Sequence, residues 1–220
     1  MQEEQASVPR TRRPQQTHRG RTLDERRAER RAALLDAALE LFGTKGFAAT
    51  SIGELCKTSY VATRYFYEEY GDRDSLLLAL YDKLIEQVNG PVLAVNEPPG
   101  DDHVRRSARA RISAFVHGTA DDERIARVLL LESGSAIVEN RRRQAHEFFA
   151  KFIAQLAFPY VEAGDIRPYD VELVSLMYVG AINEAVSNWV LTPPEERHDL
   201  EYVIDNILEV FLLIRAGLET

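Results

Sequence analysis

The sequence predicts an all-α protein, built from a small N-terminal helix-turn-helix unit and a longer α-helical remainder. After Leu23, apolar residues recur three or four positions apart along most of the chain, which places them on one face of a helix. No stretch has the alternating pattern of a strand, and no segment is repeated. With 220 residues, of which 45 % are hydrophobic, the chain can form one large or two small domains with a substantial core.

Charge is distributed unevenly. Residues 10–31 carry nine arginines and three acidic residues, whereas the whole chain has a net charge of −8. A basic segment on an acidic body can bind phosphate locally while the body repels nucleic acid elsewhere. The alternative is a disordered tail that only aids solubility. The single cysteine, Cys56, and the absence of a long apolar run or an apolar signal segment lead us to expect a cytoplasmic protein without a membrane span.

The N-terminal part is expected to contain a disordered basic arm followed by a helix. Residues 1–21 contain prolines and a glycine but no periodic apolar pattern. A helical pattern begins at Leu23 and is expected to end near Gly43 or Gly46, because glycine readily takes the left-handed conformation that closes a helix.

Residues 50–73 predict two short helices separated by a tight turn. Ser51 and Glu54 form a capping-box pattern that marks the start of the first, and a break is expected at residues 59–60. The second is expected over residues 62–70. It carries three successive aromatic residues, which one helix face cannot bury because successive side chains point in different directions. Some of them are therefore expected to face solvent or a partner.

Within the second short helix, spacing separates inward from outward positions. Phe66 and Tyr70 lie four residues apart and are expected to pack inward. The positions left to the outside or the rim are Thr63, Arg64, Tyr65 and Tyr67.

A long fourth helix is expected to join two units. Asp72 can cap it, and it is expected to run to about Val88, after which an Asn-Gly-Pro sequence interrupts the chain. We place the unit boundary inside this helix. The expected division is an arm at 1–21, a helix-turn-helix unit at 22–75 and a second unit at 76–220.

The remainder is expected to be helical throughout. A Thr-Pro-Pro-Glu sequence at residues 192–195 has the pattern of a helix start and predicts where the last helix begins. The expected helices span residues 101–119, 122–133, 137–162, 169–191 and 192–218.

The last two predicted helices have more apolar surface than one core contact requires. Apolar residues lie on most sides of the final helix, and Gly180, Ala181 and Ala185 in the preceding helix would allow close helix packing. This pattern predicts a homodimer in which each subunit contributes two helices to a four-helix interface. The alternative is that both helices are internal to a monomer.

Two segments of the N-terminal unit have the pattern of a known family. They are RAALLDAALELFGTKGFAATSIGEL, from residue 31, and VATRYFYEEYGDRDSLLLAL, which ends at residue 80. Together they resemble the DNA-binding domain of the tetracycline-repressor (TetR) family. The resemblance implies that the fourth helix joins this domain to an α-helical ligand-binding and dimerisation domain. It also implies a transcriptional regulator, which we interpret as a repressor that binds a palindromic double-stranded DNA operator as a homodimer and is released by a small-molecule effector.

The resemblance implies which residues meet DNA. Tyr67 and Arg73 match positions that contact phosphates, and Arg64 could donate two hydrogen bonds to a guanine edge. The alternative for Arg64 is a phosphate contact, or an ion pair with Glu68 four residues on. The full set of expected DNA contacts is Thr50, Ser51, Thr63, Arg64, Tyr65, Tyr67 and Arg73, with Arg19 and Arg21 of the arm entering the minor groove.

The segment departs from the family pattern at the turn and late in the second short helix. Tyr60 occupies the turn position where glycine is usual, so a left-handed tyrosine there costs on the order of 1 kcal/mol unless the turn is reshaped. Ala62 replaces the usual capping serine or threonine. Glu68 and Glu69 would repel phosphates if they faced DNA.

The resemblance also implies a ligand pocket in the C-terminal helices. Aromatic residues with a few polar groups describe such a pocket, although they describe a helical core equally well. The candidate lining residues are Phe115, His117, Phe149, Phe152, Met177, Tyr178, Asn183 and Trp189.

Nothing in the sequence predicts an enzyme. The chain lacks a nucleophile elbow, a phosphate loop, a dinucleotide glycine motif and histidines at metal-ligand spacing, so we expect no cofactor and no metal. The expected location is the cytoplasm, at the nucleoid through DNA binding. Two alternatives keep the same fold: an architectural DNA-binding factor without a ligand, and an enzyme or ligand binder that does not bind DNA.

Overall fold

The structure, a computed structural model, describes residues 22–98, 102–132, 135–167 and 169–219. Within these ranges the fold is all-α, as predicted, and its only extended pairing is an isolated bridge between Ile166 and Glu219. The elements in chain order are α1 (Leu23–Lys45), α2 (Ile52–Ser59), α3 (Thr63–Glu69), α4 (Arg73–Ala94), α5 (His103–Ala120), α6 (Glu123–Ala126), the π-helical segment η1 (Arg127–Leu131), α7 (Ala136–Ala163), α8 (Val171–Leu191), the 3₁₀ turn η2 (Pro194–Glu196) and α9 (Leu200–Ala216).

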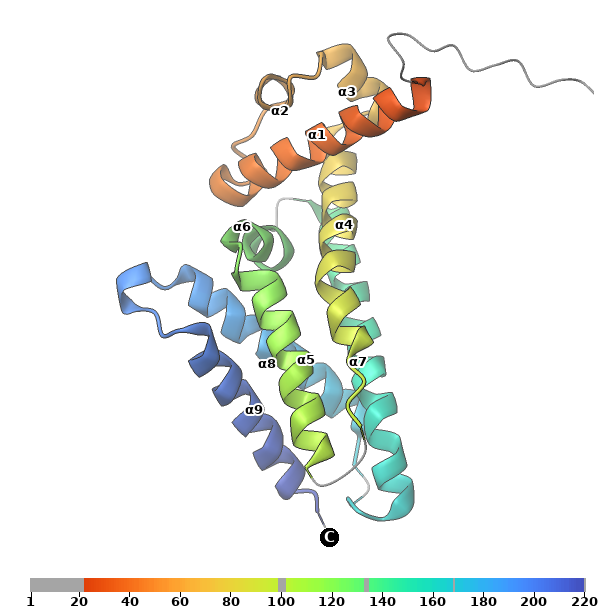
Figure 1. The fold of residues 1–220 in the computed structure, drawn as a ribbon, viewed down its shortest axis with the longest axis vertical. Helices are drawn as coiled ribbons and strands as arrows, with labels where there is room; N and C mark the ends of the chain where they lie inside the picture. The colour runs from red at the N-terminus through yellow and green to blue at the C-terminus, as the bar shows by residue number, and fades with distance from the viewer. Residues whose placement is uncertain (1–21, 99–101, 133–134, 168, 220) are drawn as a thin grey trace, which may run out of the picture.

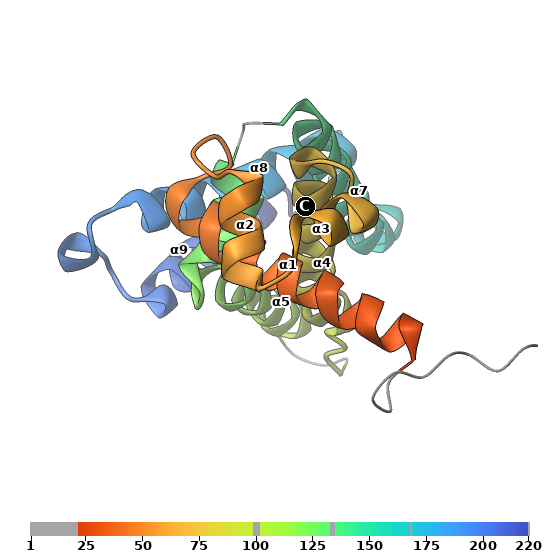
Figure 2. The ribbon, with the colours of Figure 1, turned by 90° about the horizontal axis from the view of Figure 1, so that it is seen from above.

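The helices form two groups that share α4. Figure 1 shows α1, α2 and α3 at one end of an elongated molecule, with α4 running from them along the second group. In Figure 2 the same three helices cover the end that faces the viewer. Buried residues of α1–α4 form one hydrophobic cluster, which also takes in Ile125, Val128 and Leu129 from α6 and η1. A second cluster joins α5, α8 and α9. The core of the N-terminal group therefore extends along α4 into the second group.

The local signals for the first four helices are confirmed. The hydroxyl of Ser51 accepts from the backbone N–H of Glu54, whose carboxylate accepts in return from the backbone N–H of Ser51. The carboxylate of Asp72 caps α4 by accepting from Ser75 at 2.7 Å. Helix α1 ends at Gly46, which has a positive φ of 85°. Each signal acts within four residues, so neighbouring sequence suffices to specify it.

The turn between α2 and α3 keeps the left-handed geometry despite its tyrosine. Tyr60 has φ 55° and ψ 26°, and its side chain is 96 % exposed. Its backbone N–H donates to the carbonyl of Lys57, and that of Val61 donates to Cys56. Ala62 begins α3 without a side-chain cap. The turn is therefore not reshaped, and the strain of a left-handed non-glycine residue remains in the fold.

Helix α4 is longer than predicted. It continues through Asn89, Gly90 and Pro91 to Ala94, although the sequence predicted an end at about Val88. Val88 and Val92 lie one turn apart and are both buried. Burial of these side chains against the second group stabilises the last turn in spite of the proline.

The expected helix at 122–133 is interrupted by a π-helical segment. The backbone N–H of Glu132 donates to the carbonyl of Arg127, five residues back, at 2.8 Å. Arg142 of α7 donates to the carbonyl of Leu129 at 2.9 Å and to that of Glu132. A side chain from another helix thus satisfies carbonyls that a regular helix would bond internally.

The last helix begins later than the proline pattern predicted. The prolines start only the short turn η2, and Asp199 caps α9 by accepting from Tyr202 at 2.7 Å. Arg197 lies between η2 and α9 and donates to the carbonyls of Thr192 at 2.6 Å and Val190 at 2.8 Å. These hydrogen bonds fix an extended residue where a continuous helix was expected. No helix in the described ranges has the length and apolar character needed to cross a membrane.

Replacing Tyr60 with glycine should stabilise the protein. Glycine takes the left-handed conformation freely, and the exposed tyrosine ring loses few contacts, so the free energy of unfolding should rise by about 0.5–1 kcal/mol. Chemical denaturation of Tyr60→Gly against Tyr60→Ala measures this, because alanine removes the ring but keeps the strain. Equal stability of the two variants would show that the turn stores no strain.

Candidate nucleic-acid interface and internal cavity

The outer face of α3 presents the residues that the sequence assigned to it. Phe66 is fully buried and Tyr70 is 9 % exposed, which confirms their inward orientation. Tyr67 is 55 % exposed. Thr63 is exposed, whereas Tyr65 is half-buried. The successive aromatic residues are therefore divided between the core and the surface.

Arg64 is held by its own helix. Its Nη2 donates to the hydroxyl of Tyr65 at 3.0 Å, and its Nε lies 3.3 Å from the carboxylate of Glu68. The ion pair with Glu68, one of the alternatives for Arg64, is therefore present. The Arg64 side chain is 74 % exposed, and an exposed pair of this kind contributes little stability. Arg64 can accordingly exchange Glu68 for another partner at small cost.

Glu69 faces α1 rather than solvent. Its carboxylate accepts from Arg27 at 2.8 Å and from Arg30 at 3.1 Å, and Arg31 lies 3.9 Å away. The Glu69 side chain is only 1 % exposed. Burial alone would raise the pKa of this carboxyl, but the hydrogen bonds from Arg27 and Arg30 outweigh it and hold the pKa below its usual value. The concern that Glu69 faces DNA is therefore removed, and three arginines of the basic segment are committed to α3.

Arg73 supports the loop that precedes α2. Its Nη1 donates to the carbonyl of Phe47 at 3.1 Å and to that of Thr50, and its guanidinium stacks 4.7 Å from the centre of the Phe47 ring. Thr50 is buried, and its hydroxyl donates to the carbonyl of Gly46 at 2.9 Å. Ser51 is exposed beside it. The sequence did not reveal this structural role of Arg73, since the carbonyls it contacts lie more than twenty residues away.

The remaining expected DNA contacts, Arg19 and Arg21, lie outside the described residues. The contacts with DNA assigned to all of these residues stay predictions.

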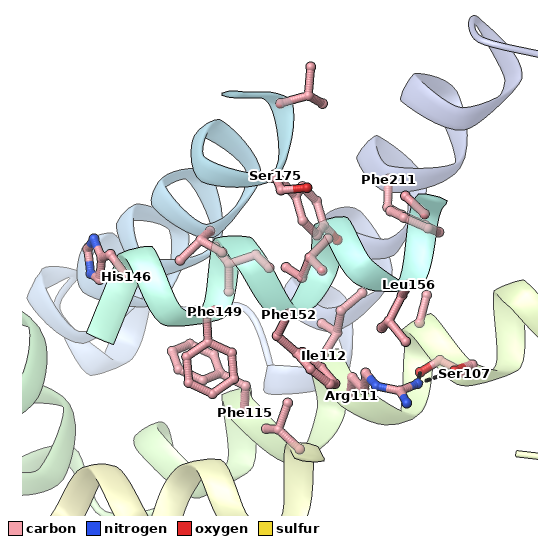
Figure 3. Close-up of a pocket in the computed structure, with 18 of the residues that line it drawn as sticks. Ser107, Arg111, Ile112, Phe115, His146, Phe149, Phe152, Leu156, Ser175 and Phe211 are labelled. Carbon is pink, nitrogen blue, oxygen red and sulfur yellow. Dashed lines mark hydrogen bonds between the residues drawn. The ribbon is translucent and has the colours of Figure 1, made fainter. Parts of the chain in front are cut away.

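A cavity of about 270 Å³ lies between α4, α5, η1, α7, α8 and α9. Figure 3 shows Phe115, Phe149 and Phe152 projecting into it from α5 and α7. Tyr178 and Asn183 of α8 also line it. Its surface is mainly apolar, with a few polar groups, which is the composition of small-molecule sites.

Three of the expected pocket residues lie elsewhere. His117 faces Asp121 at 3.0 Å and Glu201 at 3.4 Å on the outside of α5. Met177 is 66 % exposed. Trp189 donates from its ring nitrogen to the carbonyl of His198 and borders a separate hollow between α8 and α9. All three lie on helices that form the cavity, but on faces turned away from it.

Two polar groups on the cavity wall were not singled out from the sequence. Arg111 donates to Ser107 on the same helix and to the carbonyl of Val95 at 2.9 Å. His146 accepts at Nε2 from the side-chain amide of Asn183 at 2.8 Å. Burial, and then the positive charge of Arg142, lower the pKa of His146. Arg111 lies four residues before Phe115, so helical spacing from an expected pocket residue could have identified it.

The described residues hold no group of three or more histidine, cysteine or acidic side chains placed to bind a metal ion.

Comparison with known proteins identifies the N-terminal arrangement. Residues 34–80 match the family model for bacterial regulatory proteins of the tetR family. Residues 34–80 therefore form a DNA-binding domain of the TetR type. Among curated proteins, this chain is 20 % identical to the fatty acid metabolism regulator protein of Bacillus subtilis (strain 168), over 81 % of the chain and 92 % of that relative.

Solved structures share the whole fold. The transcriptional regulator FadR from Bacillus subtilis, in complex with stearoyl-CoA, has a TM-score of 0.66 at 20 % identity and covers 81 % of this chain and 96 % of its own. AibR, in complex with isovaleryl coenzyme A and operator DNA, has a TM-score of 0.63 at 18 % identity. The match covers 82 % of this chain and 97 % of the AibR chain. The likeness establishes the TetR-like fold, and together with the family match it makes the chain a DNA-binding regulator of transcription.

Replacing Glu69 with glutamine should lower thermal stability at neutral pH. Because the pKa of Glu69 is lowered in the folded state, its contribution is present above the ordinary glutamate pKa and is lost as the pH falls through the lowered value. The difference in melting temperature between wild type and Glu69→Gln should therefore shrink below about pH 4. Melting curves across this range measure it.

Glu68→Gln is the matched control, since the neighbouring Glu68 is 51 % exposed and should contribute little at any pH. A Glu69→Gln effect that stayed constant down to low pH would contradict an ionised Glu69.

Proposed function

We propose that the protein is a transcriptional repressor that binds a palindromic operator as a homodimer and leaves it when a small molecule occupies the cavity. The observation that carries this proposal is the position of α4. Leu76, Leu77 and Leu80 of α4 belong to the core that holds α1–α3 together. Tyr81 and Ile85 of the same helix line the cavity. A displacement of the cavity wall therefore has a direct mechanical route to α3.

In the proposed complex α3 lies in the major groove. Thr63, Arg64 and Tyr65 face base edges, while Tyr67 and Arg73 contact phosphates. Thr50 and Ser51 lie at the N-terminus of α2, where the backbone amides of the first turn favour a further phosphate. Arg19 and Arg21 of the arm enter the adjacent minor groove. The exposure of Thr63, Arg64 and Tyr67 supports this arrangement.

The homodimer would form through α8 and α9. Both helices carry large apolar side chains that stay exposed in the single chain, whereas the opposite face of α9 is buried against α5. Exposed apolar side chains on two helices that touch each other favour a partner over a monomer with both helices internal. The exposed large hydrophobic residues are Leu173, Leu176, Met177 and Leu191 on α8, and Tyr202, Val210, Leu213 and Ile214 on α9.

A second contact between the two groups runs through α6 and η1. A Cβ atom at Gly43 of α1 would lie 2.5 Å from the Cβ of Arg124, so the two helices approach as closely as glycine allows. The carboxylate of Glu132 accepts from the backbone N–H of Phe47 at 2.8 Å. Leu129, in η1 between these contacts, lines the cavity. Movement of η1 would therefore reach α1 while movement of α4 reaches α3.

The effector is proposed to be an acyl thioester or a related amphiphile. FadR and AibR, which share the fold, were solved with stearoyl-CoA and isovaleryl coenzyme A. The mainly apolar cavity supports a ligand of this class here. Such a ligand releases DNA only to the extent that it binds the DNA-free conformation more tightly.

The two alternatives that keep the fold are less well supported. An architectural factor needs no cavity, and this protein has one lined by aromatic residues. A protein that had lost DNA binding would have no reason to expose Arg64 and Tyr67 on α3.

Arg64→Ala should lose discrimination at one position of the operator. Wild-type protein is first expected to shift its own promoter region in a mobility assay at fixed salt, and acyl thioesters are expected to reverse the shift. The variant is then compared with wild type on a series of single-base operator changes. A bidentate contact to guanine predicts a loss of about 1–3 kcal/mol that is confined to one base pair per half-site.

Glu68→Gln is the control, because it frees Arg64 from its ion pair without removing it. If Arg64→Ala weakened binding equally on every operator sequence, Arg64 would contact a phosphate and not a base. Absence of any sequence-specific shift by the wild type would overturn the proposed function.

A further inference from the structure

Arg111 places a half-buried cation on the wall of the cavity. Its Nη2 donates to the carbonyl of Val95 at 2.9 Å, and its Nη1 donates to the carbonyl of Ser107 at 3.3 Å and to the Ser107 hydroxyl. Its Nε is buried and has no acceptor among the described residues. The guanidinium lies 5.8 Å from the centre of the Phe152 ring. Of the three nitrogens of the group, Nε is therefore the one left without an acceptor.

The charge of Arg111 has no counter-ion in the described part of the chain. Its partners are two carbonyls and a hydroxyl, none of which carries a full negative charge. Burial lowers the pKa of Arg111, and Glu97, which acts in the opposite direction, pairs instead with Arg106 at 3.6 Å. Because an arginine stays protonated in proteins, the site keeps a positive charge to which no acidic side chain of the described residues is directly bonded. An anionic or strongly accepting oxygen in the cavity would offset that cost.

The rest of the wall suits an aliphatic chain. Figure 3 shows Arg111 and Ser107 together on α5, below Phe152 and Leu156 of α7, with His146 well away from them at the other end of the drawn part of α7. Between these polar groups the wall is formed by aromatic and aliphatic side chains, among them Phe115 and Phe149. The cavity thus combines a long apolar surface with two arginines on its wall, Arg111 without a directly bonded acid and Arg215 paired with Glu219 at 3.2 Å.

We propose that Arg111 recognises the acyl group of the effector. Its guanidinium donates a hydrogen bond to the carbonyl or carboxylate oxygen while the aliphatic chain fills the apolar cavity. The shared chemistry is an oxygen acceptor at the end of a hydrocarbon chain, which either a free fatty acid or its thioester supplies. This assignment rests on the proposed function, which takes the cavity as the effector site and an acyl compound or a related amphiphile as the effector.

Arg111 also has a structural role, which the test must separate from ligand recognition. Its two Nη atoms tie the end of α4 to α5 through Val95 and Ser107. Loss of that tie would weaken binding of every ligand alike. Loss of a specific acceptor bond would weaken only ligands that carry the acceptor.

The experiment measures direct binding to the full-length protein without DNA, by titration calorimetry, for palmitate, palmitoyl-coenzyme A and hexadecanol. Arg111→Met should weaken binding of the acyl ligand roughly 10- to 100-fold, because a charge-assisted hydrogen bond is lost. Binding of hexadecanol, whose hydroxyl is a weaker acceptor, should fall by less than about 3-fold. Should Arg111→Met fail to fold, Arg111→Gln replaces it, since the amide keeps donors towards the backbone carbonyls but removes the charge.

The matched control is Arg109→Met, two residues away on α5, because Arg109 pairs with Glu201 and Asp205 on α9 and does not line the cavity. It should leave all three affinities unchanged. An effect on palmitate alone would identify the free acid as the source of the acyl group, and an effect on palmitoyl-coenzyme A would identify the thioester. No binding of either acyl probe to wild type, no effect of Arg111→Met, or an equal loss that includes hexadecanol would overturn the proposal. Because DNA is absent, failure of operator binding would leave this result intact.

Discussion

The continuity of α4 is the constraint on which the rest of the structure depends. Its first turns supply Leu76, Leu77 and Leu80 to the core beneath α2 and α3, and its later turns supply Tyr81, Ile85 and Val92 to the cavity wall. A close-packed helix does not bend freely, so a side chain displaced at one end changes the position of the other. Pro91 does not interrupt this path, because it lies in the last turn, beyond the residues that contact the N-terminal core.

The distribution of charge fits a protein that meets DNA with one surface only. Glu69 of α3 forms ion pairs with three arginines of the basic N-terminal segment, Arg27, Arg30 and Arg31. These pairs fix α3 against α1. Few cationic side chains on α3 and next to it then remain to contact DNA. Among the arginines for which the structure shows an ion pair, Arg64 is the most exposed. Specific geometry, more than bulk charge, would govern operator binding in such a protein.

Local signals predicted the start of the fold, and distant contacts account for what the sequence did not reveal. The Ser51–Glu54 box, the Asp72 cap and the left-handed Tyr60 each depend on a few neighbouring residues. The π-helical segment depends on Arg142, and the late start of α9 depends on Arg197, both through carbonyls that no local pattern marks. The same holds in the cavity, where the family resemblance implied a pocket lined by aromatic residues of α5, α7 and α8, but no local pattern set the rotation that turns His117 and Trp189 outward.

The central claim is that cavity occupancy changes the separation of the two α3 helices in the dimer. Spin labels at Lys57→Cys, an exposed site on α2, in a Cys56→Ala background allow pulsed electron resonance to measure this distance. With operator DNA the distances should correspond to recognition helices about 34–36 Å apart. With palmitoyl-coenzyme A and no DNA the distribution should move by several ångströms. Identical distributions in the two states would contradict the account.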